Sequence, residues 1–334
     1  MPRGLIATLA AAIFLHAGLA AAAPLKLATL APEGSPWHEV LVDIGEGWKK
    51  ESGGQVTVRI YPGGVAGDEG DMIRKLRIGQ LQLAALSGAG LSQIAPEIQA
   101  LQMPMMLDSD AELDYVRDQL APQLEALMEK QGFKILSWSD AGWVRFFTQR
   151  PAVRPADLKA MKIFTWEGDP TYAEAMKAMG YQPVPMAATD IYAGLQSGLI
   201  NALPTTPIAA LSYQWFGLAN QMTDVKWAPL VGALVISSAA WKSIPDAMKP
   251  VVLRVAQDAA RRSAPKIRAF DGEAIAAMKT HGLVVHEVPP DALAEWRAVA
   301  QAGYRMIVDK AVPAATVAEV EKLRDAYRAT HQSN

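Results

Sequence analysis

Residues 55–86 read QVTVRIYPGGVAGDEGDMIRKLRIGQLQLAAL, a segment in which two apolar runs flank a charged one. Residues 55–61 alternate between polar and apolar side chains, which predicts a β-strand. Pro62-Gly63-Gly64 favours a turn, residues 71–79 predict a short helix, and residues 81–87 predict another strand. A helix that joins two strands is typical of parallel pairing, so the segment predicts an α/β domain.

The same alternation extends toward the N-terminus. Residues 25–30 (LKLATL) predict a short apolar strand. Ser35 followed by Pro36 predicts the start of a helix that runs to Lys50. The apolar side chains of that helix fall on one face: Trp37, Val40, Leu41, Ile44 and Trp48.

The later segments continue the pattern without an internal repeat or an obvious linker. Further strands are predicted over residues 135–140, 143–148, 162–166, 183–186, 199–203 and 283–288. Further helices are predicted over residues 171–179, 190–197, 245–282, 290–310 and 316–330. If the chain forms two domains, we expect it to cross between them several times.

The composition excludes several classes of protein. The chain has 334 residues, enough for two domains or one large one, and its formal net charge is −2. A near-neutral balance argues against nucleic-acid binding, which requires a basic surface. The absence of cysteine excludes disulfides, zinc–thiolate sites, iron–sulfur clusters and cysteine nucleophiles. Tryptophan is unusually frequent, with nine residues against eight tyrosines and seven phenylalanines.

Residues 1–22 have the pattern of a cleaved export signal. Arg3 supplies the positive end, residues 5–19 are almost entirely apolar, and cleavage is expected after Ala22 within a run of alanines. The apolar run is too short for a membrane span, and so is the later run over residues 229–241. We therefore expect an exported, periplasmic protein that is not itself embedded in the membrane.

Catalytic and metal-binding motifs are scarce. The histidines lack the spacing of a metal site, and the hydrolase elbow, the dinucleotide fingerprint and the P-loop are missing, so no metal and no cofactor are expected. Glu167 and Asp169 lie at the start of a predicted helix, where they cap it, contact a ligand or, in an enzyme, act as acid and base. Residues 63–71 form either a flexible turn or a loop at the lip of a cleft.

Four segments resemble, in their order and spacing, the solute-binding subunit of TRAP transporters, the DctP-like family. They are 28-ATLAPEGSPWHEV-40, residues 55–86, 151-PAVRPADLKAMKI-163 and 185-PMAATDIYAGLQSGLINA-202. The resemblance implies a periplasmic receptor that closes on a small ligand by hinge motion. Such receptors deliver the ligand to a small and a large membrane subunit.

The resemblance also implies an architecture. The expected fold is α/β, a two-lobe, type II-like periplasmic-binding-protein fold with chain crossovers at a hinge and a long helix that spans both lobes. Residues 23–141 and 231–270 would form the first lobe. Residues 142–230 and 271–334 would form the second lobe.

The chain departs from the family where the ligand carboxylate is usually held. Most members place an arginine where this chain has Phe164, and many place a second one where it has Val144. Many members also have an amide side chain later in the chain, where this sequence has Thr205 or Thr206. Arg145 is adjacent to Val144, and adjacent residues of a strand point to opposite faces. Arg145 therefore reaches the site only if the alignment shifts by one residue.

The missing arginine predicts an apolar, aromatic or weakly polar ligand, because a buried carboxylate without a cationic partner is costly. The predicted ligand-binding residues are rings and a few polar groups: Phe164, Trp166, Trp37, Trp143 and Trp215, with Ser87, Thr205, Thr206 and Glu167. Each tryptophan has core packing as its alternative role.

Three other functions stay open. One is a conventional organic-acid receptor that uses Arg145. Another is a periplasmic enzyme, and the third is a module that passes its ligand to a sensor or another partner. The sequence also resembles the subgroup associated with tetratricopeptide-repeat proteins, which implies a hydrophobic ligand and a periplasmic repeat-protein partner.

Overall fold

The computed structural model describes residues 23–331, so the predicted export signal lies outside the described residues. Within this range, nine strands form one mixed sheet in the order β2-β1-β3-β8-β4-β7-β5-β6, and β9 pairs with β8. Their bounds are β1 Leu25–Thr29, β2 Val58–Tyr61, β3 Leu83–Ser87, β4 Phe133–Thr148, β5 Lys162–Trp166, β6 Gln182–Met186, β7 Ala202–Thr205, β8 Gln221–Ser237 and β9 Val284–Glu287.

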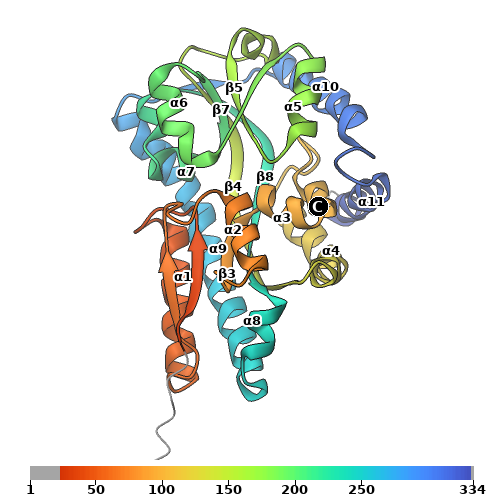
Figure 1. Ribbon diagram of the computed structural model, residues 1–334. Coiled ribbons are helices and arrows are strands. Elements are labelled where there is room, and N and C mark those ends of the chain that lie inside the picture. The colour runs from red at the N-terminus through yellow and green to blue at the C-terminus, as the bar shows by residue number, and fades with distance from the viewer. Residues whose placement is uncertain (1–22, 332–334) are drawn as a thin grey trace, which may run out of the picture.

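The long strands β4 and β8 run through both lobes of the molecule (Figure 1). They pair antiparallel, and β3 joins one end of the pair at Ser87↔Gly232 whereas β7 joins the other end at Arg145↔Thr205. Strands β1 to β3 therefore belong to one lobe and β5 to β7 to the other. The two strands predicted over residues 135–140 and 143–148 are one strand, β4, whose register shifts at a bulge between Asp140 and Trp143.

The first lobe carries the parallel strands that residues 25–87 predicted. Strand β1 pairs in parallel with β2 and with β3, which confirms the α/β pattern. Helix α1 begins after Ser35, whose side chain accepts a hydrogen bond from the His38 backbone. The helices of this lobe are α1 Pro36–Glu51, α2 Glu69–Arg77, α3 Gly88–Ile94, α4 Asp110–Lys130 and α8 Ser238–Ser243, with a 3₁₀ segment over Pro96–Gln102.

The second lobe repeats the arrangement on the other side of β4 and β8. Strand β5 pairs in parallel with β6 and β7, and β6, the strand predicted over residues 183–186, lies at the edge of the sheet. Its helices are α5 Pro170–Ala178, α6 Ile191–Ser197, α7 Pro207–Ser212 and α10 Pro290–Ile307.

Helix α9, Lys249–Thr280, runs along both lobes and confirms the predicted long helix. In the first lobe it packs on α1, where the indole of Trp48 donates to the carbonyl of Val252 at 3.0 Å. In the second lobe it packs on α7, and Asp271 meets Arg145 of β4. None of the helices within residues 23–331 is both long and apolar enough to cross a membrane.

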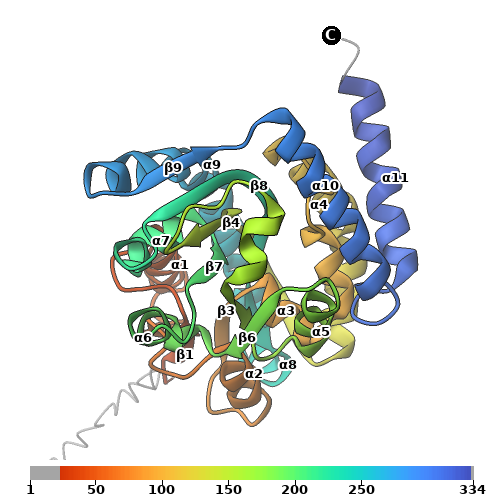
Figure 2. The ribbon, with the colours of Figure 1, turned by 90° about the horizontal axis from the view of Figure 1, so that it is seen from above.

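The C-terminal helix α11, Ala314–His331, packs against α4 and against the 3₁₀ segment Pro96–Gln102, which precedes α4 (Figure 2). Its Val317 and Val320 share a core with Leu113 and Val116 of α4. This packing differs from the predicted division, which grouped α11 with the second lobe. The other boundaries of that division stay a prediction.

Candidate functional site

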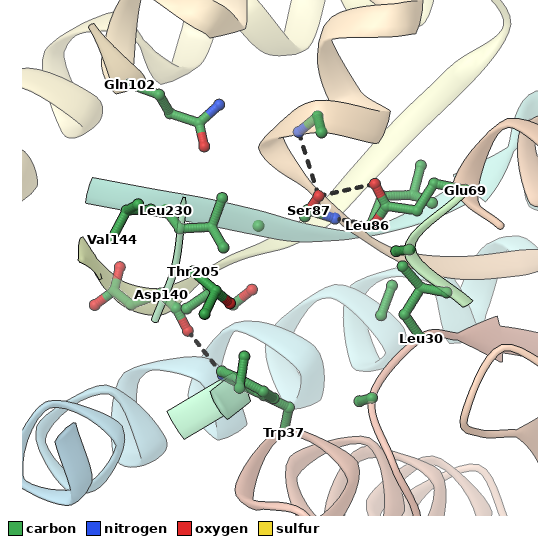
Figure 3. A pocket seen from close by; sticks show the side chains of 18 of the residues that line it. Leu30, Trp37, Glu69, Leu86, Ser87, Gln102, Asp140, Val144, Thr205 and Leu230 are labelled. Atoms are coloured by element: carbon green, nitrogen blue, oxygen red, sulfur yellow. Dashed lines mark hydrogen bonds between the residues drawn. The ribbon is translucent and has the colours of Figure 1, made fainter. Parts of the chain in front are cut away.

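A cavity of about 310 Å³ lies where the two lobes face each other, and both lobes and the crossing strands line it. Leu30, Trp37 and Ser87 come from the first lobe, and Thr205 from the second. Val144 and Leu230 come from the crossing strands β4 and β8 (Figure 3). The volume suits a small molecule, and a cleft between lobes is a common place for a ligand site.

Aromatic rings form much of the cavity wall. Phe164 and Trp166 meet edge to face with their ring centroids 5.7 Å apart. Tyr213 and Trp215 stack with centroids 4.4 Å apart. The full set of lining rings is Trp37, Phe164, Trp166, Tyr172, Tyr213, Trp215 and Trp227. These rings offer large apolar surface with edge N–H and O–H groups.

Glu69, in the first turn of α2, is the most deeply buried carboxyl group on the cavity, with 2% of the residue exposed. Its Oε1 accepts from the backbone N–H of Ser87 at 2.6 Å, and its Oε2 accepts from the Ser87 hydroxyl at 2.8 Å (Figure 3). A Cβ atom at Gly90 would lie 2.6 Å from Oε2, so only glycine leaves room there. Burial raises the pKa of Glu69 from 4.5 to about 7.

Two other carboxyl groups line the cavity. Asp169 caps α5 by accepting from the Tyr172 backbone at 3.0 Å, and burial raises its pKa. Asp140 is held by two cations, Arg117 at 2.9 Å and Arg268 at 2.8 Å. Among the described residues, no lysine, arginine or histidine lines the cavity.

The structure brings most of the predicted site residues together. Seven positions that the sequence singled out line the cavity: Trp37, Ser87, Val144, Phe164, Trp166, Thr205 and Trp215. Phe164 and Val144, which the resemblance aligns with carboxylate-binding arginines, are among them, but that alignment stays a prediction. Ligand contact by these residues stays a prediction.

Four predicted residues do not line this cavity, and each has a local partner or lies in solvent. Thr206 caps α7 by accepting from the Ala209 backbone at 3.3 Å. The indole of Trp143 donates to Asp110 at 2.7 Å, and Glu167 is exposed. Arg145 is buried on the other side of β4, where it pairs with Asp224 at 3.0 Å and Asp271 at 2.9 Å.

Arg145 faces a second cavity of about 210 Å³, which Trp143, Lys226 and Asp271 also line. Val144 faces the main cavity, so the two neighbours point to opposite faces of the strand as expected. Arg145 therefore does not line the main cavity, and the absence of a carboxylate-binding arginine stays a prediction.

Sequence reasoning missed the groups that connect the lobes across the cavity mouth. Asp68 Oδ2 accepts from the Trp166 indole at 3.0 Å and from the Ala188 backbone at 3.1 Å. The Tyr213 hydroxyl donates to the carbonyl of Leu30 at 2.5 Å. The only signal in the sequence was the loop over residues 63–71, for which a position at the lip of a cleft was one of two interpretations.

Comparisons with known proteins give the family. The sequence model of the DctP family, described as bacterial extracellular solute-binding protein, family 7, matches residues 27–311. A solute-binding protein of Roseobacter denitrificans is 28% identical over 265 residues, which cover 77% of this chain and 79% of the relative.

Solved structures share the fold. A TRAP periplasmic solute-binding protein of Sulfurospirillum deleyianum with bound succinate has a TM-score of 0.84 at 20% identity, covering 90% of this chain and 98% of its own. Its counterpart from Ralstonia eutropha with bound (S)-2-acetolactate has a TM-score of 0.84 at 21% identity, covering 91% and 99%. The two-lobe α/β periplasmic-binding-protein fold is thereby confirmed. With the family model matching most of its length, the chain belongs to family 7 of the bacterial extracellular solute-binding proteins, the DctP family.

Proposed function

We propose that this chain is the exported receptor of a TRAP transporter and that it captures a small, largely apolar or aromatic ligand in the cavity between its lobes. Membership of the DctP family supports the receptor class. The observation that carries the ligand class is a cavity walled by aromatic rings on which, within the described chain, no basic side chain lies.

The charge of the wall argues against a buried carboxylate. A carboxylate taken out of water needs a cation or several hydrogen-bond donors to offset its lost hydration. Phe164 and Val144 offer neither, and the nearby Arg145 is neutralised by two aspartates on the far side of β4. Glu69 and Asp169 would repel such a ligand whenever they are ionised.

An organic acid is the second candidate, and the comparisons favour it. The similar structures from Sulfurospirillum deleyianum and Ralstonia eutropha hold succinate and acetolactate. For this chain to bind such a ligand, hydroxyl and amide groups such as those of Ser87, Thr205 and Gln102 would have to hold the carboxylate. Glu69 and Asp169 on the cavity wall would also have to be protonated, or to lie far from the ligand carboxylate.

Delivery completes the proposal. The receptor would hand its ligand to a small and a large membrane subunit, without turnover and without a cofactor. A periplasmic tetratricopeptide-repeat protein is a further proposed partner, on the basis of the sequence resemblance alone. Conversion of a bound ligand to product would instead support the enzyme alternative.

Native mass spectrometry of the purified protein tests the ligand class directly. We expect a co-purified ligand with aromatic or aliphatic rather than sugar-acid composition. In parallel, succinate and sialic acid should leave the melting temperature unchanged. Strong thermal stabilisation by succinate would establish the organic-acid candidate in place of the apolar one.

A further inference from the structure

We infer that the ligand carries a protonated nitrogen, held by Glu69 and by the surrounding aromatic rings. This inference rests on the proposed function, since it concerns the ligand of the same cavity. In the family's usual arrangement the ligand is the anion and the protein supplies the cation. Here the ligand would be the cation and the protein would supply the anion.

The carboxyl group of Glu69 is buried without a cation. Its hydrogen-bond donors in the described structure are neutral: the Ser87 backbone and hydroxyl, together with the backbone of Gly90. Each carboxylate oxygen can accept more than one hydrogen bond, so capacity remains on the cavity side. A buried carboxyl of this kind becomes a strong acceptor when a charged donor enters the cavity.

The other carboxyl groups fit the same interpretation. Asp169 lines the cavity with no basic neighbour, and the aspartate beside Glu69, Asp68, is satisfied by N–H groups alone. Asp140 is different, because Arg117 and Arg268 already neutralise it. The carboxyl groups of the wall that have no basic neighbour are thus Glu69 and Asp169.

The aromatic rings supply the second half of the argument. An ammonium group is attracted to the face of an indole or phenol ring, and desolvation strengthens that attraction. Trp37, Trp166 and Tyr213 lie on the same cavity as Glu69. A neutral apolar ligand would use these rings equally well but would bring no cation to the Glu69 carboxyl.

The titration of Glu69 gives the inference a pH dependence. The groups beside it are Asp68, the N-cap residue of α2, Ser87 at the end of β3, and Tyr213 of the segment after α7, whose pKa is raised by burial and by Glu69. None of these groups is basic, so none of them offsets a negative charge on Glu69. A cationic ligand favours ionised Glu69, so its affinity should rise as the pH increases through about 7.

Three probes with one apolar body and different head groups test the inference: 3-phenylpropylamine, 3-phenylpropanol and 3-phenylpropanoate. Isothermal titration calorimetry of the full mature protein measures the affinity for each. We expect the amine to bind about tenfold or more tightly than the alcohol, as a charge-assisted contact would give, and the acid to bind most weakly. The advantage of the amine should grow with pH.

Variants assign the effect to one carboxyl group. Glu69→Gln keeps the size, and its amide oxygen can still accept from the Ser87 backbone N–H; it should remove the preference for the amine over the alcohol. Glu46→Gln removes the same charge from an exposed position of α1, away from the cavity, and should keep the preference. Circular dichroism checks that both variants are folded, and the comparison of probes on the unmodified protein stands without them.

Each outcome decides the inference. Equal binding of the amine and the alcohol would overturn it and leave the proposed apolar receptor intact. Tightest binding of the acid would overturn both and support the organic-acid candidate. If none of the probes binds at millimolar concentration, the inference fails, while the proposed function is still judged by the co-purified ligand.

Discussion

Glu69 is the most deeply buried carboxyl group on the cavity wall. Its burial makes the free energy of unfolding depend on pH. Its pKa is about 7 in the folded chain, against an ordinary value of 4.5. The folded state therefore holds the proton more tightly than the unfolded chain. The resulting stabilisation is full below pH 4.5 and is lost as the pH rises toward 7.

The change that tests this dependence is Glu69→Gln, which stays neutral at every pH. We expect the variant to exceed the unmodified protein in free energy of unfolding by about 3 kcal/mol at about pH 8, and by less than about 1 kcal/mol at about pH 5. Urea denaturation across this pH range measures the difference. Glu46→Gln is the control, and a pH-independent gap between Glu69→Gln and the unmodified protein would contradict the pKa.

Phe164 has a double role that the sequence did not separate. Its ring lines the cavity, but only 3% of the residue is exposed, and it packs in a core with Phe147, Ile191 and Leu195. If Phe164 only lined a ligand site, truncation of its ring would weaken ligand binding with little loss of folding. The packing changes the second half of that expectation.

We expect Phe164→Ala to lower the free energy of unfolding by about 3–5 kcal/mol, because it removes a buried ring and leaves a void. Phe164→Leu fills most of the volume, so we expect it to fold nearly as well and to weaken binding of an aromatic ligand. Urea denaturation and calorimetry separate the two effects. Unchanged affinity in a well-folded Phe164→Leu would place the residue in the core alone.

The sequence predicted cavity residues through the family alignment and through its frequent aromatic side chains. Phe164, Val144 and Thr205 line the cavity at positions that this alignment marks. Glu69 has no such mark, because an acid in the first turn of a helix is common and its burial depends on Ser87 and Gly90. The ion pairs of Arg145 were equally hidden, since its partners lie 79 and 126 residues away.

At the scale of elements, local pattern predicted the short strands and failed for the long ones. Strands β1, β3, β5 and β6 follow their apolar runs closely. Strand β8, Gln221–Ser237, was missed because its second half is a continuous apolar run and not an alternating one: every residue from Val231 to Ser237 is buried. Strand β4 was divided because its bulge leaves Gly142 with a φ of 92° in mid-strand.

Helix α9 is tied to the crossing strand β4 by a charge network. Arg268 of α9 donates to Asp140 of β4 and to Asp114 of α4, and Arg117 of α4 also donates to Asp140. The Asp140 side chain is only 6% exposed, so loss of one cation leaves its charge poorly compensated.

We expect Arg268→Met to lower the free energy of unfolding by about 3 kcal/mol, the usual cost of breaking a buried ion pair from one side. Denaturant titration measures the loss, and an unchanged slope would show that the fold is retained. Arg262→Met is the matched control, because Arg262 is exposed on the same helix. Equal stability of the two variants would mean that the network contributes nothing.

At the scale of the whole molecule, the lobes meet through a few specific contacts at the mouth of the cavity. Asp68 joins the start of α2 to Trp166 and Ala188 of the second lobe, and Tyr213 joins that lobe to Leu30. These groups come from loops and strand ends that are far apart in sequence. Their meeting depends on how the two lobes are oriented, which no local pattern encodes.

Gly64 tests whether this approach of the lobes is needed for binding. A Cβ atom there would lie 2.8 Å from Cγ2 of Thr189 in the second lobe, whereas one at Gly63 would meet nothing within 4 Å. Both glycines have a positive φ, 74° at Gly64 and 64° at Gly63. Alanine therefore costs about 1–2 kcal/mol of backbone strain at either position. We expect Gly64→Ala to bind ligand about tenfold more weakly than Gly63→Ala at similar stability, since it hinders closure. Calorimetry with the co-purified ligand measures this ratio, and equal affinities would show that the contact at Gly64 is not part of the ligand-bound state.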